Sequence, residues 1–125
     1  MKIIAFNSSP RGINSNTQIM VDCFLEGAKQ IGAEIEHVPL STKRIQHCNR
    51  NNCVSIEKSC CKIKDDMQEL YPKAINADIL LLATPLYGDS VTGVMKDFID
   101  RLIVMGNLPY FEKDENGEFR HRIKN

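Results

Sequence analysis

The residues best suited to chemistry form a polar stretch near the start of the chain, NSSPRGINSNT at 7–17. This stretch follows an apolar run and precedes a helical pattern, so it joins the end of a strand to the start of a helix. Helix N-termini present unpaired N–H groups and the positive end of the helix dipole, which together favour an anion. Hydroxyl, amide and guanidinium groups can add side-chain donors to that anion. Such side chains occur at Ser8, Ser9, Arg11, Ser15, Asn16 and Thr17.

A phosphate group is the anion that this loop predicts. The alternative is an ordinary turn in which Ser15 or Asn16 caps the helix. A cap needs only one such residue, whereas polar residues are clustered here, so we favour phosphate binding. The spacing matches neither GxGxxG nor GxxxxGK[ST]. A polar loop without obligatory glycines suits a terminal phosphate monoester, such as that of flavin mononucleotide (FMN).

Four cysteines lie close together in a second polar segment, the cysteine loop at 41–64. Four thiolates in one loop can hold an iron–sulfur cluster or a zinc ion. Their spacing is irregular, because four residues separate the first two and the last two are adjacent. Three ligands with a fourth from outside, a local disulfide, and free thiols without metal are the alternatives. The four residues are Cys48, Cys53, Cys60 and Cys61.

Cys23 and His47 are also of residue types that bind metals, but we expect neither to act as a ligand. Cys23 is expected in the core, on the apolar face of a helix. His47, beside the first cysteine of the loop, is expected to be an exposed loop histidine, with metal ligation as the alternative.

The chain alternates between strand and helix patterns. Apolar runs predict strands at 2–6, 34–40 and 77–87. Helical spacing predicts helices at 17–31, 66–76 and 92–105, the second with Asp65 as its N-cap. On the first helix the apolar face is expected to comprise Ile19, Met20, Cys23, Phe24, Ala28 and Ile31.

This alternation predicts an α/β fold, with a doubly wound parallel sheet between two layers of helices. Ligands of such sheets sit beyond the carboxyl ends of the strands, where the strand order reverses. A strand order that begins 2-1-3 brings the loop at 7–16 and the loop after 77–87 to one crevice. In the second loop Pro85 stiffens the backbone, and Gly88 permits close approach to a ligand.

The strand at 77–87 is expected to be buried on both faces, because it is continuously apolar. In a 2-1-3 sheet it would be an edge strand, which another chain, the tail or a missing C-terminal portion would have to cover. We favour the last alternative, in which the single domain at 1–125 lacks its C-terminal part. The tail at 106–125 is expected to form a hairpin around Asn116-Gly117 or to be extended.

Composition limits the classes of function. The chain has 125 residues, 42% of them apolar, with 16 basic and 16 acidic residues. This balance disfavours a nucleic-acid-binding role, which needs a basic face. No apolar stretch is long enough to span a membrane, and the start at Met1 does not resemble a signal peptide. We therefore expect a cytoplasmic protein without membrane or nucleic-acid partners.

Two motifs together carry a family resemblance. SSPRGINSNT and TPLYGDSVTGVMKDFIDR make residues 1 to about 101 resemble the flavodoxin-like NAD(P)H-dependent FMN reductases, in particular their iron–sulfur flavoprotein branch. The resemblance implies that the FMN phosphate is bound by Ser9, Arg11, Ser15, Asn16 and Thr17. It implies that the isoalloxazine ring contacts the loop formed by Pro85, Leu86, Tyr87 and Gly88. It also implies a [4Fe–4S] cluster on Cys48, Cys53, Cys60 and Cys61.

The resemblance implies an oxidoreductase that passes electrons from NAD(P)H or a protein donor to a small molecule or a ferredoxin-like protein, as a homodimer or homotetramer. No side chain is assigned a catalytic role, because the flavin itself accepts electrons. One alternative is a non-enzymatic electron carrier, which the neutral net charge disfavours. The other is a binding module that senses redox state through its cysteines.

Overall fold

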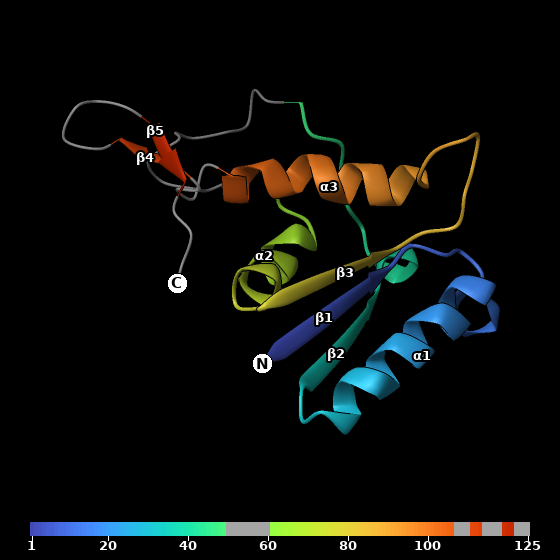
Figure 1. The fold of residues 1–125 in the computed structure, drawn as a ribbon. Helices are drawn as coiled ribbons and strands as arrows, with labels where there is room; N and C mark the ends of the chain where they lie inside the picture. The colour runs from blue at the N-terminus through green and yellow to red at the C-terminus, as the bar shows by residue number, and fades with distance from the viewer. Residues whose placement is uncertain (50–60, 107–110, 114–118, 122–125) are drawn as a thin grey trace.

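The computed structural model describes residues 1–49, 61–106, 111–113 and 119–121. Three parallel strands form its main sheet, in the order β2-β1-β3. Helix α1 covers one face of this sheet, and helices α2 and α3 lie on the other (Figure 1). The strands are β1 (Lys2–Asn7), β2 (Glu34–Pro39) and β3 (Ile79–Ala83), and the helices are α1 (Asn16–Gln30), α2 (Met67–Ile75) and α3 (Gly93–Gly106). The predicted doubly wound sheet and its strand order are confirmed.

Strand β1 is the centre of the fold. Its alternate residues Ile3 and Ala5 pack beneath α1, while Ile4 and Phe6 pack against α2 and α3. The rings of Phe6 and Phe98 lie 4.5 Å apart between their centroids, which joins β1 to α3. Both loops of interest leave the sheet at the carboxyl edge that this packing fixes.

The apolar face predicted for α1 is wrong except at Ala28. Val21, Leu25 and Ala28 face the sheet together with Gln18, which is also buried. The exposed residues are Ile19, Met20, Cys23, Phe24 and Ile31. The error has a physical cause: the helix is apolar over more than one face, and a polar residue with a buried hydrogen-bond partner marks the side that faces the sheet.

Strand β3 is shorter and more exposed than predicted. It spans five residues, and Ile79 and Leu82 remain 38% and 40% exposed. Within the described part of the chain it pairs only with β1, so one of its edges and part of each face lack a neighbour. Strand β2, predicted as an edge strand, is confirmed as one.

Helix α2 begins one residue later than predicted, with Asp66 at the capping position. The Asp65 carboxylate accepts a hydrogen bond from the Met67 amide (3.2 Å), but its main partner lies on α3. Beyond α3, strands β4 (Phe111–Lys113) and β5 (Phe119–His121) pair antiparallel, which fits the hairpin alternative. Asn116-Gly117 lies outside the described residues. No helix in the described ranges has the length and apolar character needed to cross a membrane.

Candidate functional site

The polar loop between β1 and α1 is held by a buried amide network. The Asn7 side-chain carbonyl accepts a hydrogen bond from the Ser9 amide (2.9 Å), and its Nδ2 donates to Oε1 of Gln18 (2.8 Å). All three residues are buried. The network ties the end of the strand to the first turn of the helix. Asn7 and Gln18 were missed from sequence, although an amide residue at a sheet-facing position of an amphipathic helix was the available signal.

Ser15 shapes the loop. Its hydroxyl accepts a hydrogen bond from the Gln18 amide (3.0 Å) and donates to the Gly12 carbonyl (2.8 Å). Its own amide also donates to Gly12 (3.3 Å). Ser15 therefore caps the helix, and its contact with a phosphate stays a prediction.

The loop does need a glycine, contrary to the sequence interpretation. Gly12 has φ +54°, in the left-handed region where a Cβ is strained. It begins the 3₁₀ turn Gly12–Asn14, which turns the chain into α1.

The remaining predicted phosphate ligands surround the N-terminus of α1. Asn16 and Thr17 are its first two residues, so no carbonyl within the helix can accept from their amides. Arg11 is exposed and directly precedes the 3₁₀ turn, and Ser9 is buried, with its carbonyl accepting from the Gly12 amide (3.2 Å). Two amides without an acceptor inside the helix, a threonine hydroxyl and the long, exposed side chain of Arg11 lie near one helix terminus, and these groups fit a phosphate dianion.

The second predicted loop is built around a tight turn. Gly88 and Asp89 both have positive φ (54° and 58°), and Tyr87 and Ser90 exchange backbone hydrogen bonds of 2.9 and 3.1 Å. This is the pattern of a type I′ turn, so Gly88 serves backbone conformation. Leu86 and Tyr87 present their side chains to solvent, 75% and 52% exposed.

The base of the second loop is fastened to α3. The Thr92 amide donates to Oγ1 of Thr84 (3.1 Å), and that hydroxyl donates to the Pro85 carbonyl (3.0 Å). Thr92 in turn accepts from the Met95 amide at the start of α3 (3.4 Å). The loop therefore has fixed ends, a turn at Gly88-Asp89 and two exposed apolar side chains, Leu86 and Tyr87, before that turn.

The two loops border one hollow of about 380 Å³, which is within the size range of small-molecule sites. The first loop contributes Ser8 and Pro10, and the second contributes Tyr87 with the start of α3. Sequence reasoning missed the third wall, which follows β2. The full lining is Ser8, Pro10, Leu40, Ser41, Lys43, Tyr87, Thr92, Gly93 and Val94. The predicted meeting of both loops at one crevice is confirmed.

The predicted cysteine site is described only in part. Cys48 and Cys61 are half-buried, without disulfide partners, while Cys53 and Cys60 lie outside the described residues. Where the structure describes the chain, no three His, Cys, Asp or Glu side chains are grouped for a metal ion. Cys23, expected in the core, is exposed because α1 turns a different face to the sheet.

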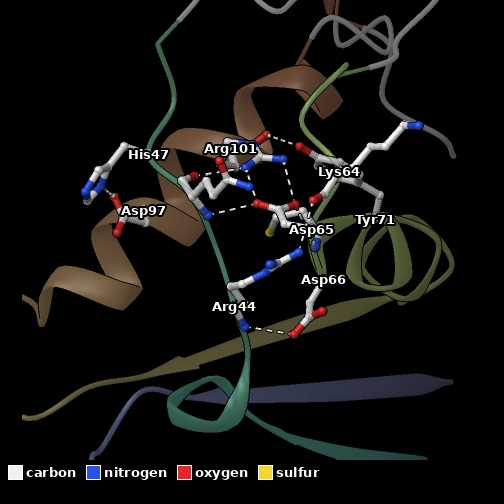
Figure 2. Close-up of polar contacts among 10 residues, drawn as sticks. Arg44, His47, Lys64, Asp65, Asp66, Tyr71, Asp97 and Arg101 are labelled. Atoms are coloured by element: carbon white, nitrogen blue, oxygen red, sulfur yellow. Dashed lines mark hydrogen bonds and ion pairs between the residues drawn. The ribbon is translucent and has the colours of Figure 1, made fainter.

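A buried ion pair lies at the base of the cysteine loop (Figure 2). Arg101 Nη1 and Nη2 contact the two carboxylate oxygens of Asp65 at 2.7 and 3.1 Å, and both side chains are 0% exposed. Burial alone would raise the pKa of Asp65, but hydrogen bonds from Arg101 and from the Gln46 and Met67 amides hold the pKa below its ordinary value. Burial would lower the pKa of Arg101, and its bonds to Asp65 keep that pKa above its ordinary value. Both groups are therefore ionised at neutral pH.

His47 is paired across the surface with α3. Its Nδ1 lies 2.6 Å from Oδ1 of Asp97, and the imidazole is exposed as predicted (Figure 2). The hydrogen bond to Asp97 and the charge of that carboxylate raise the pKa of His47 above 6.5.

We expect Asp97→Asn to lower the His47 titration midpoint, because it removes both the charge and the anionic acceptor. Proton NMR of the imidazole resonances across pH 5–9 measures this. The raised pKa means that the pair stabilises the fold at low pH and loses this contribution as pH rises through the His47 midpoint. Asp100→Asn on the same helix is the control and should leave the midpoint in place; an unchanged midpoint in Asp97→Asn would contradict the pairing.

Comparison with known proteins shows the family of this chain. The family model for NADPH-dependent FMN reductases matches residues 1–123. An iron-sulfur flavoprotein of Archaeoglobus fulgidus is 35% identical over 109 residues, which cover 86% of this chain and 52% of that protein. An FMN-dependent NADPH-azoreductase of Staphylococcus aureus is 32% identical over 100 residues, which cover 80% of this chain and 50% of that protein.

Among solved structures, that of a flavone reductase matches with a TM-score of 0.63 and 29% identity, over 82% of this chain and 30% of that one. The chain spans about half the length of the curated relatives it matches. The family match covers nearly all of the chain, and both loops that carry the motifs border one hollow. The chain belongs to the NADPH-dependent FMN reductase family, and the iron–sulfur flavoproteins are among its relatives.

Proposed function

We propose that this chain binds FMN across its two loops and acts as an NAD(P)H-dependent oxidoreductase, passing electrons from NAD(P)H or a protein donor to an acceptor. The observation that carries the proposal is the hollow of about 380 Å³ that the loop at 7–17 and the loop at 85–88 both border. Bound FMN would accept and donate electrons, either one or two at a time. The protein has to bind and orient that group, and these are the roles that the loops support.

Each of the two loops has a distinct role in this proposal, and the phosphate ligands lie outside the lining of the hollow, at the N-terminus of α1. The amides of Asn16 and Thr17, with Arg11, bind the phosphate at the positive end of the α1 dipole. Pro85, with φ fixed by its ring, and the type I′ turn at Gly88 fix the conformation of the second loop, which would contact the isoalloxazine ring of bound FMN. The exposed side chain of Tyr87 borders the same hollow. No acid–base side chain is required.

An iron–sulfur cluster on Cys48, Cys53, Cys60 and Cys61 is part of the proposal. It is supported by four cysteines in one loop and by relatives that are named iron-sulfur flavoproteins. The half-buried, unpaired thiols of Cys48 and Cys61 are compatible with a ligand role. A homodimer or homotetramer in the reducing cytoplasm completes the proposal. The compartment is supported by the five cysteines of the chain, which in a reducing setting serve metal or redox chemistry more often than disulfides.

The test is an anaerobic visible spectrum of the purified chain, with iron assayed on the same sample, followed by titration with NADPH. We expect flavin bands that bleach on addition of NADPH, and a broad cluster absorbance with iron present. Flavin bands that do not bleach would favour the electron-carrier alternative, and bands without iron would remove the cluster. A chain that binds no FMN would contradict the proposal.

A further inference from the structure

The two chain segments that flank the cysteine loop are bonded to each other. The Arg44 amide donates to Oδ2 of Asp66 (2.8 Å), and the Asp66 amide donates to the Arg44 carbonyl (3.2 Å). The Gln46 amide donates to Oδ2 of Asp65 (2.8 Å), and Arg44 Nη2 reaches the Lys64 carbonyl (3.4 Å). Segments 44–46 and 64–66 therefore lie side by side, 20 residues apart in sequence, as Figure 2 shows.

Arg101 of α3 joins both segments with one side chain. Its Nη1 donates to the Gln46 carbonyl (2.9 Å) in the first segment and to Asp65 (2.7 Å) in the second. Its Nη2 donates to the other oxygen of Asp65 (3.1 Å). On the far side, the Tyr71 hydroxyl donates to the Arg101 carbonyl (3.2 Å), which ties α2 to the same point.

We propose that Asp65 and Arg101 are a positioning pair that fixes the separation of these two segments. The pair thereby sets the positions of Cys48 and Cys61 relative to α3. Cys48 follows Gln46 by two residues, and Cys61 precedes Asp65 by four. Both cysteines are half-buried, and these short sequence separations keep each within a few residues of the bonded segments. The inference rests on the proposed function only in that these thiols are candidate ligands.

The chemistry of the pair suits this role. A guanidinium is planar and can meet a carboxylate through two nitrogens while a hydrogen on the same fork reaches a carbonyl. These bonds are directional, whereas apolar packing would hold α3 without defining the spacing of two backbone segments. Lysine, with a single nitrogen, cannot reproduce the fork.

The test separates positioning from general support of the fold. Asp65→Leu/Arg101→Met keeps an apolar pair of similar bulk between the helix and the segments while it removes the directional bonds. In reduced, metal-free protein, alkylation of each cysteine by iodoacetamide is followed by peptide mass spectrometry. Exposed Cys23 calibrates the rate of an accessible thiol, and amide hydrogen exchange in β1 reports opening of the whole domain.

We expect alkylation of Cys48 and Cys61 to accelerate at least tenfold in the double variant, with exchange in β1 unchanged. Arg101→Lys, which keeps the charge, should give a smaller increase at the same two thiols. Asp100→Asn is the matched control. Asp100 directly precedes Arg101 in the sequence, but its ion pair with Lys96 is exposed. It should change neither rate.

Two results would overturn the inference. Unchanged alkylation rates of Cys48 and Cys61 in both the double variant and Arg101→Lys would mean that the pair does not set the positions of these thiols. Alkylation that rises only in step with β1 exchange would mean that the pair simply supports the fold. Neither measurement uses FMN or a metal, so its failure is distinct from failure of the proposed function.

Discussion

Replacing Arg101 with methionine is expected to lower the free energy of unfolding by about 3–5 kcal/mol, because it leaves the Asp65 carboxylate buried without its counter-charge. The side chain of Asp65 is 0% exposed, so its carboxylate depends on protein groups rather than on bulk water for charge compensation. The same change removes the donor to the Gln46 carbonyl. Urea unfolding followed by circular dichroism at pH 7 measures the loss.

Two variants show whether the loss comes from the unpaired charge. Asp65→Leu/Arg101→Met should recover most of the stability, because no ion is left buried. Lys96→Met removes a member of an exposed ion pair on the same helix and should cost no more than about 1 kcal/mol. A loss below about 1 kcal/mol in Arg101→Met would show that the pair is not a tightly coupled buried contact.

Replacing Arg11 with alanine is expected to weaken FMN binding roughly 10- to 150-fold, the equivalent of about 1.5–3 kcal/mol for a hydrogen bond to a charged group. Arg11 is exposed in the loop before α1, and it contributes to the 3₁₀ turn through its backbone carbonyl, which accepts from the Asn14 amide (3.3 Å), but not through a side-chain cap. The loop itself should therefore keep its conformation. Quenching of flavin fluorescence during titration with the protein gives the dissociation constant.

Lys29→Ala is the matched control for this variant. Lys29 is a basic residue in the last turn of α1, at the end opposite the proposed phosphate site. Its removal changes net charge equally but should leave FMN affinity within about twofold, because exposed charges at this distance are largely screened. Equal weakening by both variants would mean that Arg11 acts through net charge and not through a bond to the phosphate.

The arrangement of the fold could be predicted because it depends on local patterns. Apolar runs and helical spacing located β1, α1, β2, α2, β3 and α3, and the alternation specified a parallel sheet. Loops at the carboxyl edge of such a sheet must meet, so the crevice followed from topology. The exposed His47 and the edge position of β2 also followed from local sequence.

The errors arose where distant residues decide the structure. The buried face of α1 depends on Gln18, whose partner Asn7 lies on another element. Asp65 was predicted to be a helix cap, but its carboxylate pairs mainly with Arg101, 36 positions later in the sequence. Gly12 was overlooked because a left-handed conformation depends on how the loop closes, which composition does not reveal. Likewise, the wall of the hollow beyond β2 carries no motif.

The measurement that tests the central claim most directly compares the binding of FMN and riboflavin to the purified chain. The two ligands share the ring and differ in the terminal phosphate. If the loop at 7–17 is a phosphate site, FMN should bind at least about 100-fold more tightly, because the phosphate gains the α1 amides and Arg11. Equal affinities for the two flavins, or no binding of FMN, would contradict the account.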